Sequence, residues 1–322
     1  MAALIDISNN RANIAFANQT PWHGLGTNLP ADADMDEWRR QAGMEWRAEK
    51  APVEYITPAG PQTSDEHFVV YRNDTNAALG IASGRYVAVQ PGEVIDFYRE
   101  LCASHGFAME TAGCLKGGKL IWALARADGS VMLPGQDRVD QYVLLSTSYD
   151  GSMATTGRWT TVRVVCANTL NAALRTKADF SLRHSSAFDP AEARKILLPQ
   201  SDFAEFAETA RKLAETPVTP EQSVEFFMAV YHDLRRGAVV SPRMEKSVEK
   251  TVERLSAQYL GASGASLASS KGTAWGLVNA VTHDIDHARK AKSNESRLTS
   301  AWYGQGNALK VKAVSEALAL AA

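Results

Sequence analysis

Two histidines and two aspartates in the segment His283-Asp284-Ile285-Asp286-His287 are the residues best suited to chemistry. His283 and His287 are four residues apart, so on a helix they would share one face, which is the spacing that offers two imidazoles to a metal ion. A zinc protease has a glutamate directly after the first histidine, whereas this chain has Asp284, and no distant third ligand can be identified. The pattern therefore favours a polar helix face over the alternative, an enzyme that uses His283, Asp286 and His287.

Three other motifs lack residues that their chemistry needs. Cys166 ends an alternating strand pattern on its apolar side, which indicates a buried structural thiol rather than a nucleophile. The glycine-rich segment 113–119 lacks the Gly-Lys-Ser/Thr sequence that opens a nucleotide-binding helix, so its glycines indicate a hairpin turn. Asp32, Asp34 and Asp36 are not followed by the glycine and glutamate of a calcium loop. The sequence therefore predicts no catalytic residues, no cofactor and no metal.

Cations and aromatic rings are interleaved in the central part of the chain. Proteins bind single-stranded DNA with cations along the phosphates and aromatic rings against the bases, and each stacked base contributes about 1–3 kcal/mol. The candidates for such contacts in this region are Arg158, Trp159, Arg163, Lys119, Lys116 and Arg85. A cross-strand pair of Trp159 and Tyr142, with arginines that solvate an ordinary sheet, explains the same pattern without DNA.

A second group of cations, Arg289, Lys290 and Lys292, lies toward the C-terminus with only Glu295 nearby. Phosphate contacts through these residues would weaken steeply as the salt concentration rises. The alternative is a solubilising helix end, where cations also complement the helix dipole. Upstream, between 243 and 254, acids and bases repeat at helical spacing, which is typical of a solvated helix.

The elements that would position these residues indicate an α+β fold with an antiparallel β-rich centre, packed helices and a mostly helical C-terminal region. We expect three consecutive regions: an N-terminal lead-in at 1–60, a β-rich α+β core at 61–199 and a helical region at 200–322. Within the core, strands are expected at 68–71, 85–90, 107–111 and 119–126, with a helix over 94–101.

Local signals predict how further elements begin and end. Asp150-Gly151 predicts a two-residue turn between alternating strands at 142–149 and 152–165. Asn168 and Thr169 are expected to cap a helix through Leu174. A linker with an extended segment at 180–183 should follow over 178–199. The expected helices outside the core lie at 33–43, 201–214, 220–236, 242–259, 271–292 and 306–321.

Composition indicates the broad class of the protein. The chain has 322 residues, of which 45% are hydrophobic, as is ordinary for a globular protein. A formal net charge of −2 argues against a uniformly basic nucleic-acid coat but allows local basic patches. Three widely spaced cysteines fit no disulfide framework and indicate a reducing compartment. No signal-peptide pattern or membrane-length apolar run is present, so we expect a cytoplasmic protein without a membrane partner.

Several segments resemble one protein family. They are Thr20-Pro21-Trp22-His23-Gly24-Leu25-Gly26, Tyr86-Val87-Ala88-Val89-Gln90-Pro91, the stretch 161–170, Gly272-Thr273-Ala274-Trp275 and Ala301-Trp302-Tyr303-Gly304. Together they are similar to the phage/plasmid-like proteins built on domain of unknown function 932, which implies a mobile element and no particular activity. The order of elements also resembles the core of Rad52-like single-strand annealing proteins, a likeness that does not by itself establish function.

These observations lead to two hypotheses. In the first, the protein is a non-enzymatic single-stranded DNA-binding or annealing accessory protein of a phage or plasmid, active in DNA recombination. Its β-rich centre would hold the strand, and its C-terminal helices would drive assembly into a homo-oligomer. In the second, it is a protein–protein interaction module of a mobile element that binds no nucleic acid, and the helical C-terminal region is the binding face.

Overall fold

The computed structural model describes residues 7–8, 11–17, 26–163, 168–171, 178–200, 203–233 and 241–322. A large antiparallel sheet and a helical C-terminal region confirm the predicted α+β class. The chain divides into two compact units that interleave along the sequence: unit 1 holds 1–128, 142–159 and 178–201, and unit 2 holds 129–141, 160–177 and 202–322. Cys166 and most of the loop at 20–26 lie outside the described residues.

The main sheet has the strand order β12-β11-β10-β9-β8-β3-β4, and β13 pairs with β11 beside that path. Strands β8 to β11 are consecutive in the chain and adjacent in the sheet. β3 pairs in parallel with β4 and antiparallel with β8. The strands are β3 (Ile14–Ala17), β4 (Thr27–Leu29), β8 (Ala108–Leu115), β9 (Leu120–Leu133), β10 (Asp137–Ser148), β11 (Thr155–Arg163), β12 (Asn168–Asn171) and β13 (Phe180–Leu182).

The turn between β8 and β9 lies where the glycines predict it. A single 3₁₀ turn, Lys116–Gly118, joins the two strands. Lys116 and Gly117 both have positive φ angles, of 55° and 68°. Glycine adopts this left-handed conformation without the steric cost that a side chain brings, which explains the glycine pattern.

The connection between β10 and β11 is longer than the predicted two-residue turn. β10 ends at Ser148 and β11 begins at Thr155. The Ser148 hydroxyl donates to the Met153 carbonyl oxygen and accepts from the Met153 amide, at 2.9 Å each, which closes a wide turn. Inside it, the Asp150 carboxylate accepts from the Ser152 amide at 3.0 Å. Local side-chain bonds of this kind compete with a tight hairpin turn.

Two further predictions of local structure are wrong. Residues 168–171, expected to start a helix, form β12, in which Thr169 pairs with Val162 and Leu170 with Thr161. Ladder hydrogen bonds with β11 therefore replace the predicted cap, and residues 172–177 lie outside the described part. Residues 85–90, expected as a strand, are irregular and lead directly into the helix that begins at Pro91.

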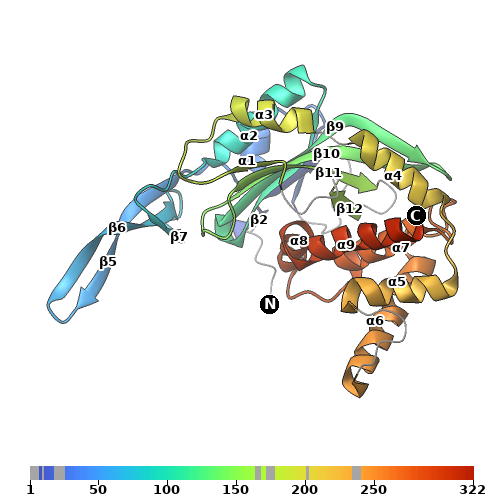
Figure 1. The fold of residues 1–322 in the computed structure, drawn as a ribbon. Helices are drawn as coiled ribbons and strands as arrows, with labels where there is room; N and C mark the ends of the chain where they lie inside the picture. The colour runs from blue at the N-terminus through green and yellow to red at the C-terminus, as the bar shows by residue number, and fades with distance from the viewer. Residues whose placement is uncertain are drawn as a thin grey trace. The chain divides into compact units, whose positions relative to one another are not determined.

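Unit 1 also contains a three-stranded sheet of β5 (Ala48–Thr57), β6 (Gly60–Arg72) and β7 (Ala78–Ser83). β7 pairs only with the 67–71 part of β6, so the rest of the β5–β6 hairpin extends beyond it (Figure 1). The helix predicted at 33–43 is confirmed as α1 (Met35–Gln41).

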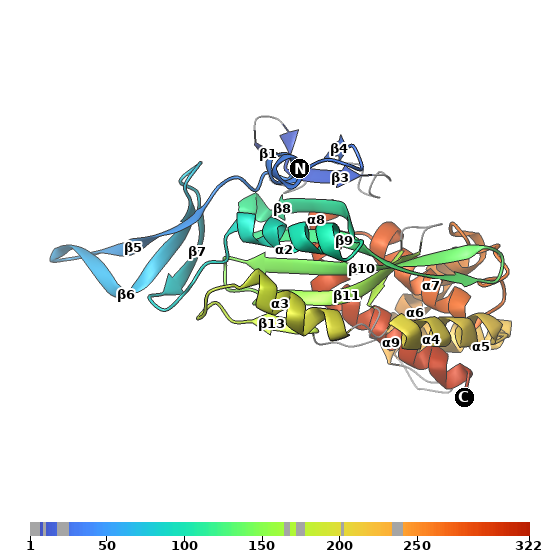
Figure 2. The same ribbon diagram turned by 90° about the horizontal axis from the view of Figure 1, so that it is seen from above.

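Helices α2 (Pro91–Ser104) and α3 (Pro190–Leu197) of unit 1 run alongside the strands (Figure 2). The Tyr98 hydroxyl of α2 lies 2.6 Å from the Ala123 carbonyl oxygen and accepts from the Leu145 amide at 2.8 Å, so it joins β9 and β10. α3 falls inside the predicted linker. Its start at Asp189-Pro190 has a capping carboxylate and a proline at the first helical position, a helix signal that the linker prediction overlooked.

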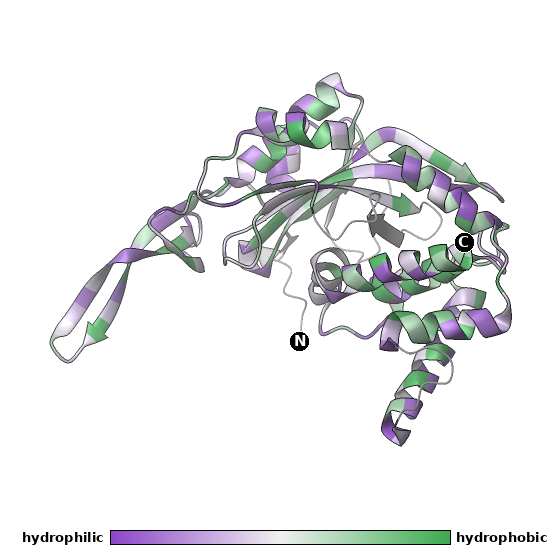
Figure 3. Cartoon of the chain, in the orientation of Figure 1, coloured by the Kyte–Doolittle hydropathy of each residue, from purple (hydrophilic) through white to green (hydrophobic). Residues whose placement is uncertain are grey.

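Unit 2 is mostly helical, and its helices carry both hydrophobic and hydrophilic residues (Figure 3). They are α4 (Phe203–Glu215), α5 (Pro220–His232), α6 (Pro242–Gly261), α7 (Ala274–His283), α8 (Asn294–Tyr303) and α9 (Gln305–Leu320). Their core includes Phe206, Phe227, Leu277, Val281 and Val314, with Val131 and Val139 from the strands. The helix expected at 271–292 is shorter, and α8 was not predicted. No described helix is both long and apolar enough to cross a membrane.

Candidate nucleic-acid interface

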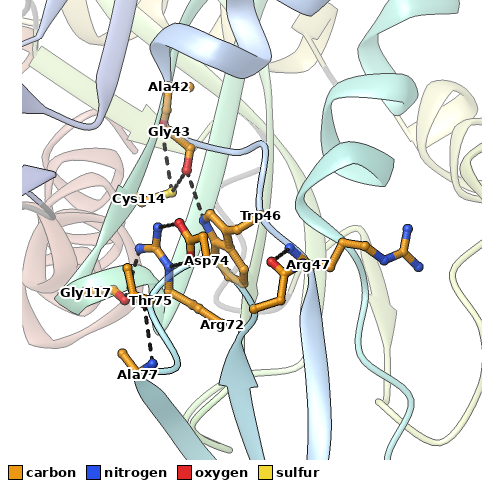
Figure 4. A network of polar contacts seen from close by, with 11 residues as sticks. Ala42, Gly43, Trp46, Arg47, Arg72, Asp74, Thr75, Ala77, Cys114 and Gly117 are labelled. Atoms are coloured by element: carbon orange, nitrogen blue, oxygen red, sulfur yellow. Dashed lines mark hydrogen bonds and ion pairs between the residues drawn. The ribbon is translucent and has the colours of Figure 1, made fainter. Parts of the chain in front are cut away.

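The turn that carries Lys116 and Lys119 is held by a buried arginine of unit 1 (Figure 4). Arg72 is 3% exposed, and its guanidinium donates to the Gly117 carbonyl oxygen at 3.4 Å. The same guanidinium makes a bidentate ion pair with Asp74, at 3.0 and 2.7 Å, and lies 4.7 Å from the ring centre of Trp46. Arg72 therefore holds the turn in place. Because its guanidinium is already paired and stacked, it is not available to a ligand.

Lys116 has a carboxylate nearby, that of Asp150. The Tyr149 amide donates to the Lys119 carbonyl oxygen at 2.8 Å, which brings the β10–β11 turn against the β8–β9 turn. Burial acts to raise the pKa of Asp150, but hydrogen bonds from Ser152 and the charge of Lys116 lower it overall. Lys116 is therefore partly neutralised, which weakens its attraction for phosphate.

The loop that carries Arg85 lies at the same end of unit 1. The hydroxyl of the neighbouring Tyr86 donates to the Ser148 carbonyl oxygen at 3.3 Å, and the Tyr86 ring stacks on His184 with 4.9 Å between ring centres. Arg85 itself is exposed. The structure thus brings Arg85, Lys116 and Lys119 to one end of the unit. The adjacent aromatic ring, that of Tyr86, makes its stacking contact within the protein.

Trp159 is not placed for base stacking. Its side chain is 4% exposed, and the indole Nε1 donates to the Leu197 carbonyl oxygen of α3 at 2.9 Å. The ring also packs against Phe107, with 6.0 Å between ring centres. Base stacking would need this ring to be exposed, but α3 covers this part of the sheet and buries it. Arg158 is half-buried, and the side chain of Arg163 lies outside the described part.

A buried ionic network lies at the end of α7 in unit 2. There the chain forms a π-helical turn, Asp284–Ala288, a local geometry often found at functional sites. Asp284 is fully buried and accepts from Arg254 Nε at 2.8 Å and from the Tyr231 hydroxyl at 2.7 Å. Asp286 accepts from Lys310 of α9 at 2.5 Å. Each aspartate therefore has its own cationic partner.

His283 directly precedes this turn, and His287 lies within it. The rings of His283 and His287 lie 4.8 Å apart, as their spacing predicts. Burial lowers the pKa of His283, although the carboxylates of Asp286 and Asp284 oppose this effect. The described residues contain no group of three or more histidine, cysteine, aspartate or glutamate side chains able to hold a metal ion. The two carboxylates are instead bound by basic side chains.

The basic segment, defined here as residues 289–297, follows the π turn directly. The Arg289 amide donates to the Asp284 carbonyl oxygen at 2.7 Å, which fixes the start of the segment. Lys290 and Lys292 are exposed, and within the described residues neither has an ion-pair partner. Arg289 and Arg297 are half-buried. As far as its described side chains show, this segment therefore presents the positive charges of Lys290 and Lys292 without ion-pair partners, on a turn that buried contacts hold in place.

The sequence patterns do not identify the partners that hold this turn. Arg254 ends the stretch of alternating acids and bases that is typical of a solvated helix. One signal was present for Lys310: it shares helical spacing with the buried Ala313, Val314 and Ala317, so it lies on the apolar face of α9. A charge on an apolar helix face indicates a buried partner.

Comparison with known proteins identifies the family. The family model described as domain of unknown function (DUF932) matches residues 78–302, most of the chain, so the protein belongs to this family. The match includes the π turn and the basic segment and excludes β5 and β6. No curated protein and no solved structure matches the chain.

Proposed function

We propose that this protein is a non-enzymatic accessory protein of a mobile element that binds single-stranded DNA through its phosphates. The observation that carries the proposal is the exposure of Lys290 and Lys292, without ion-pair partners among the described residues, beside two half-buried arginines. Lysines of this kind attract a polyanion, because binding releases the counterions condensed on the phosphates. The mobile-element context rests on the resemblance of the sequence to phage/plasmid-like proteins.

The contacts proposed here are mainly electrostatic. Because Trp159 is buried, the proposal does not use it as a base-stacking residue. Arg85, Lys116 and Lys119 provide a further cationic group on unit 1, although Asp150 offsets part of its charge. Binding dominated by phosphate contacts has little base preference and a strong dependence on salt.

A pair of charge-removing variants tests the role of the basic segment. In the first, Lys290→Ala is combined with Lys292→Ala. In the matched control, Lys246→Ala is combined with Lys250→Ala on α6, where both lysines are exposed and glutamates alternate with them. For single strands each lost phosphate contact reduces the slope of log affinity against log salt by roughly 0.7. We expect a reduction of about twice that in the first variant and little in the control; equal effects would remove the basic segment from the proposal.

The β5–β6 hairpin supports a second candidate function, interaction with a basic protein partner. Residues 51–66 contain Glu54, Asp65 and Glu66 but no lysine or arginine. Tyr55 and Ile56 near its tip are 52% and 88% exposed. Negative charge repels nucleic-acid phosphates, whereas exposed large apolar side chains are typical of protein-binding surfaces. A basic partner retained after nuclease treatment at moderate salt, and lost in the double variant Tyr55→Ser with Ile56→Ser, would support this candidate.

A further inference from the structure

Arg289 and Arg297 are brought together by the start of α8. Arg289 Nη2 lies 3.5 Å from the Ser300 hydroxyl oxygen, a long contact. Ser300 is three residues after Arg297, so both lie on one face of α8. Burial, together with the charge of Arg289, lowers the pKa of Arg297. Two guanidinium groups thus approach the same helix face.

One of these guanidinium groups is incompletely bonded. Arg297 Nη1 is buried, and it has no hydrogen-bond partner among the described residues. A buried charged donor without a partner is costly, because it has lost its water and gained nothing in return. Such a group is explained if a ligand supplies the missing acceptor.

The nearby carboxylates are already bound by other cations. Asp284 accepts from Arg254 and Tyr231, and Asp286 accepts from Lys310. Among the described side chains, the cluster holds four cations (Arg254, Arg289, Arg297 and Lys310) against these two carboxylates, so positive charge is in excess there. An anion bound between Arg289 and Arg297 would balance that excess.

The backbones of both arginines are held before any ligand binds, and the Arg297 amide donates to the Ser293 carbonyl oxygen at 3.0 Å. The Arg289 amide is bound to the Asp284 carbonyl oxygen in the π turn. The Ser300 hydroxyl, which contacts Arg289, also accepts from the Gly306 amide at 3.2 Å at the start of α9. Groups held in this way lose little conformational entropy on binding, which favours a defined site over diffuse attraction.

We propose that Arg289 and Arg297 form a discrete site for one phosphate group of the bound DNA strand. Guanidinium forks match phosphate oxygens with paired hydrogen bonds, which a lysine ammonium does not reproduce. The inference rests on the proposed function, since it assigns the phosphate to the strand that Lys290 and Lys292 attract. Free inorganic phosphate has the same chemistry, so the test separates the two sources.

The experiment measures two ligands on the same variants: a labelled single-stranded oligonucleotide by anisotropy, and inorganic phosphate by thermal shift at constant ionic strength. The variants are Arg289→Gln, Arg297→Gln and Arg297→Lys, which keeps the charge but loses the fork. The control is Arg243→Gln, which removes an exposed arginine of α6. Loss of a charged hydrogen bond is worth about 1.5–3 kcal/mol, so oligonucleotide affinity should fall about tenfold or more in all three variants, and in the control by less.

The outcomes distinguish this inference from the function on which it rests. If the arginine variants bind the oligonucleotide as the wild type does while the Lys290/Lys292 variant is weakened, the phosphate site is wrong and the proposed function stands. If inorganic phosphate stabilises the wild type and the arginine variants lose only that effect, the site serves free phosphate and the inference is overturned. If the wild type binds no oligonucleotide, both fail. Full retention by Arg297→Lys would also contradict a guanidinium-specific site.

Discussion

Lys310 Nζ lies 2.5 Å from Asp286 Oδ1, and the two side chains are 2% and 3% exposed. The pair joins α9 to the π turn at the end of α7, beside the hydrophobic core of unit 2 and the buried Asp284. Burial of two charges costs as much free energy as their attraction returns, so such a pair adds little net stability. What it provides is a fixed geometry: it holds the turn from which Arg289 and the basic segment emerge.

Breaking this pair should destabilise unit 2. Lys310→Met leaves the Asp286 carboxylate buried without its cation, and the free energy of unfolding should fall by about 3–5 kcal/mol. Adding Asp286→Leu removes the stranded charge and should restore much of the loss. Urea unfolding followed by circular dichroism measures both. A double variant no more stable than Lys310→Met would contradict the account of the pair.

Trp159 should matter for stability and not for DNA binding. Truncation of this buried ring by Trp159→Ala should cost about 3–5 kcal/mol, because it leaves a cavity beneath α3. Trp159→Phe keeps most of the volume but removes the donor to the Leu197 carbonyl oxygen, at a cost of roughly 1–3 kcal/mol. Thermal unfolding and oligonucleotide titration of the phenylalanine variant check both statements. Weaker DNA binding by a folded Trp159→Phe would restore the original base-stacking hypothesis.

Tyr98 should be a strong tie between α2 and the sheet. Its hydroxyl bonds the Ala123 carbonyl oxygen and the Leu145 amide in a site without solvent. Tyr98→Phe removes the hydroxyl partner of both backbone groups, so the free energy of unfolding should fall by about 1–3 kcal/mol. A change within a few tenths of a kcal/mol would show that the hydroxyl is not needed there.

Acidification should destabilise the protein partly through His184. Burial lowers the pKa of His184 from its usual 6.5, and hydrogen bonds to backbone groups oppose this only in part. Between the lowered pKa and 6.5 the unfolded chain binds more protons than the folded chain, so stability falls as the pH falls through that window and is fully present above it. His184→Gln should reduce the difference in urea midpoint between about pH 7.5 and pH 5. Exposed His67→Gln is the control, and the same pH dependence in all three proteins would contradict this account.

Local signals in the sequence predict the helix starts well. Thr219-Pro220 and Ser241-Pro242 each combine a capping hydroxyl with a proline at the first helical position, and α5 and α6 begin there. These bonds form within a few residues, so they do not depend on the rest of the chain. The glycine turn between β8 and β9 is predictable for the same reason.

Residues distant in the sequence decide which face of the sheet is covered and which side chains pair with the buried charges. Alternation in β11 separates two faces, but only the presence of α3 decides that the face with Trp159 is covered. Asp286 and Lys310 are 24 residues apart, and their pairing follows from how α7 and α9 pack. Periodicity is read in windows of about 11–18 residues, which are too short to contain both partners of such a contact.

Binding of single-stranded DNA is best measured by titrating a labelled oligonucleotide with the 322-residue chain and following fluorescence anisotropy at low and moderate salt. We expect binding at low salt that weakens steadily as salt rises, because phosphate contacts dominate. Absence of binding at low salt would contradict the proposed function and leave the acidic, apolar-tipped β5–β6 hairpin as the better guide to function.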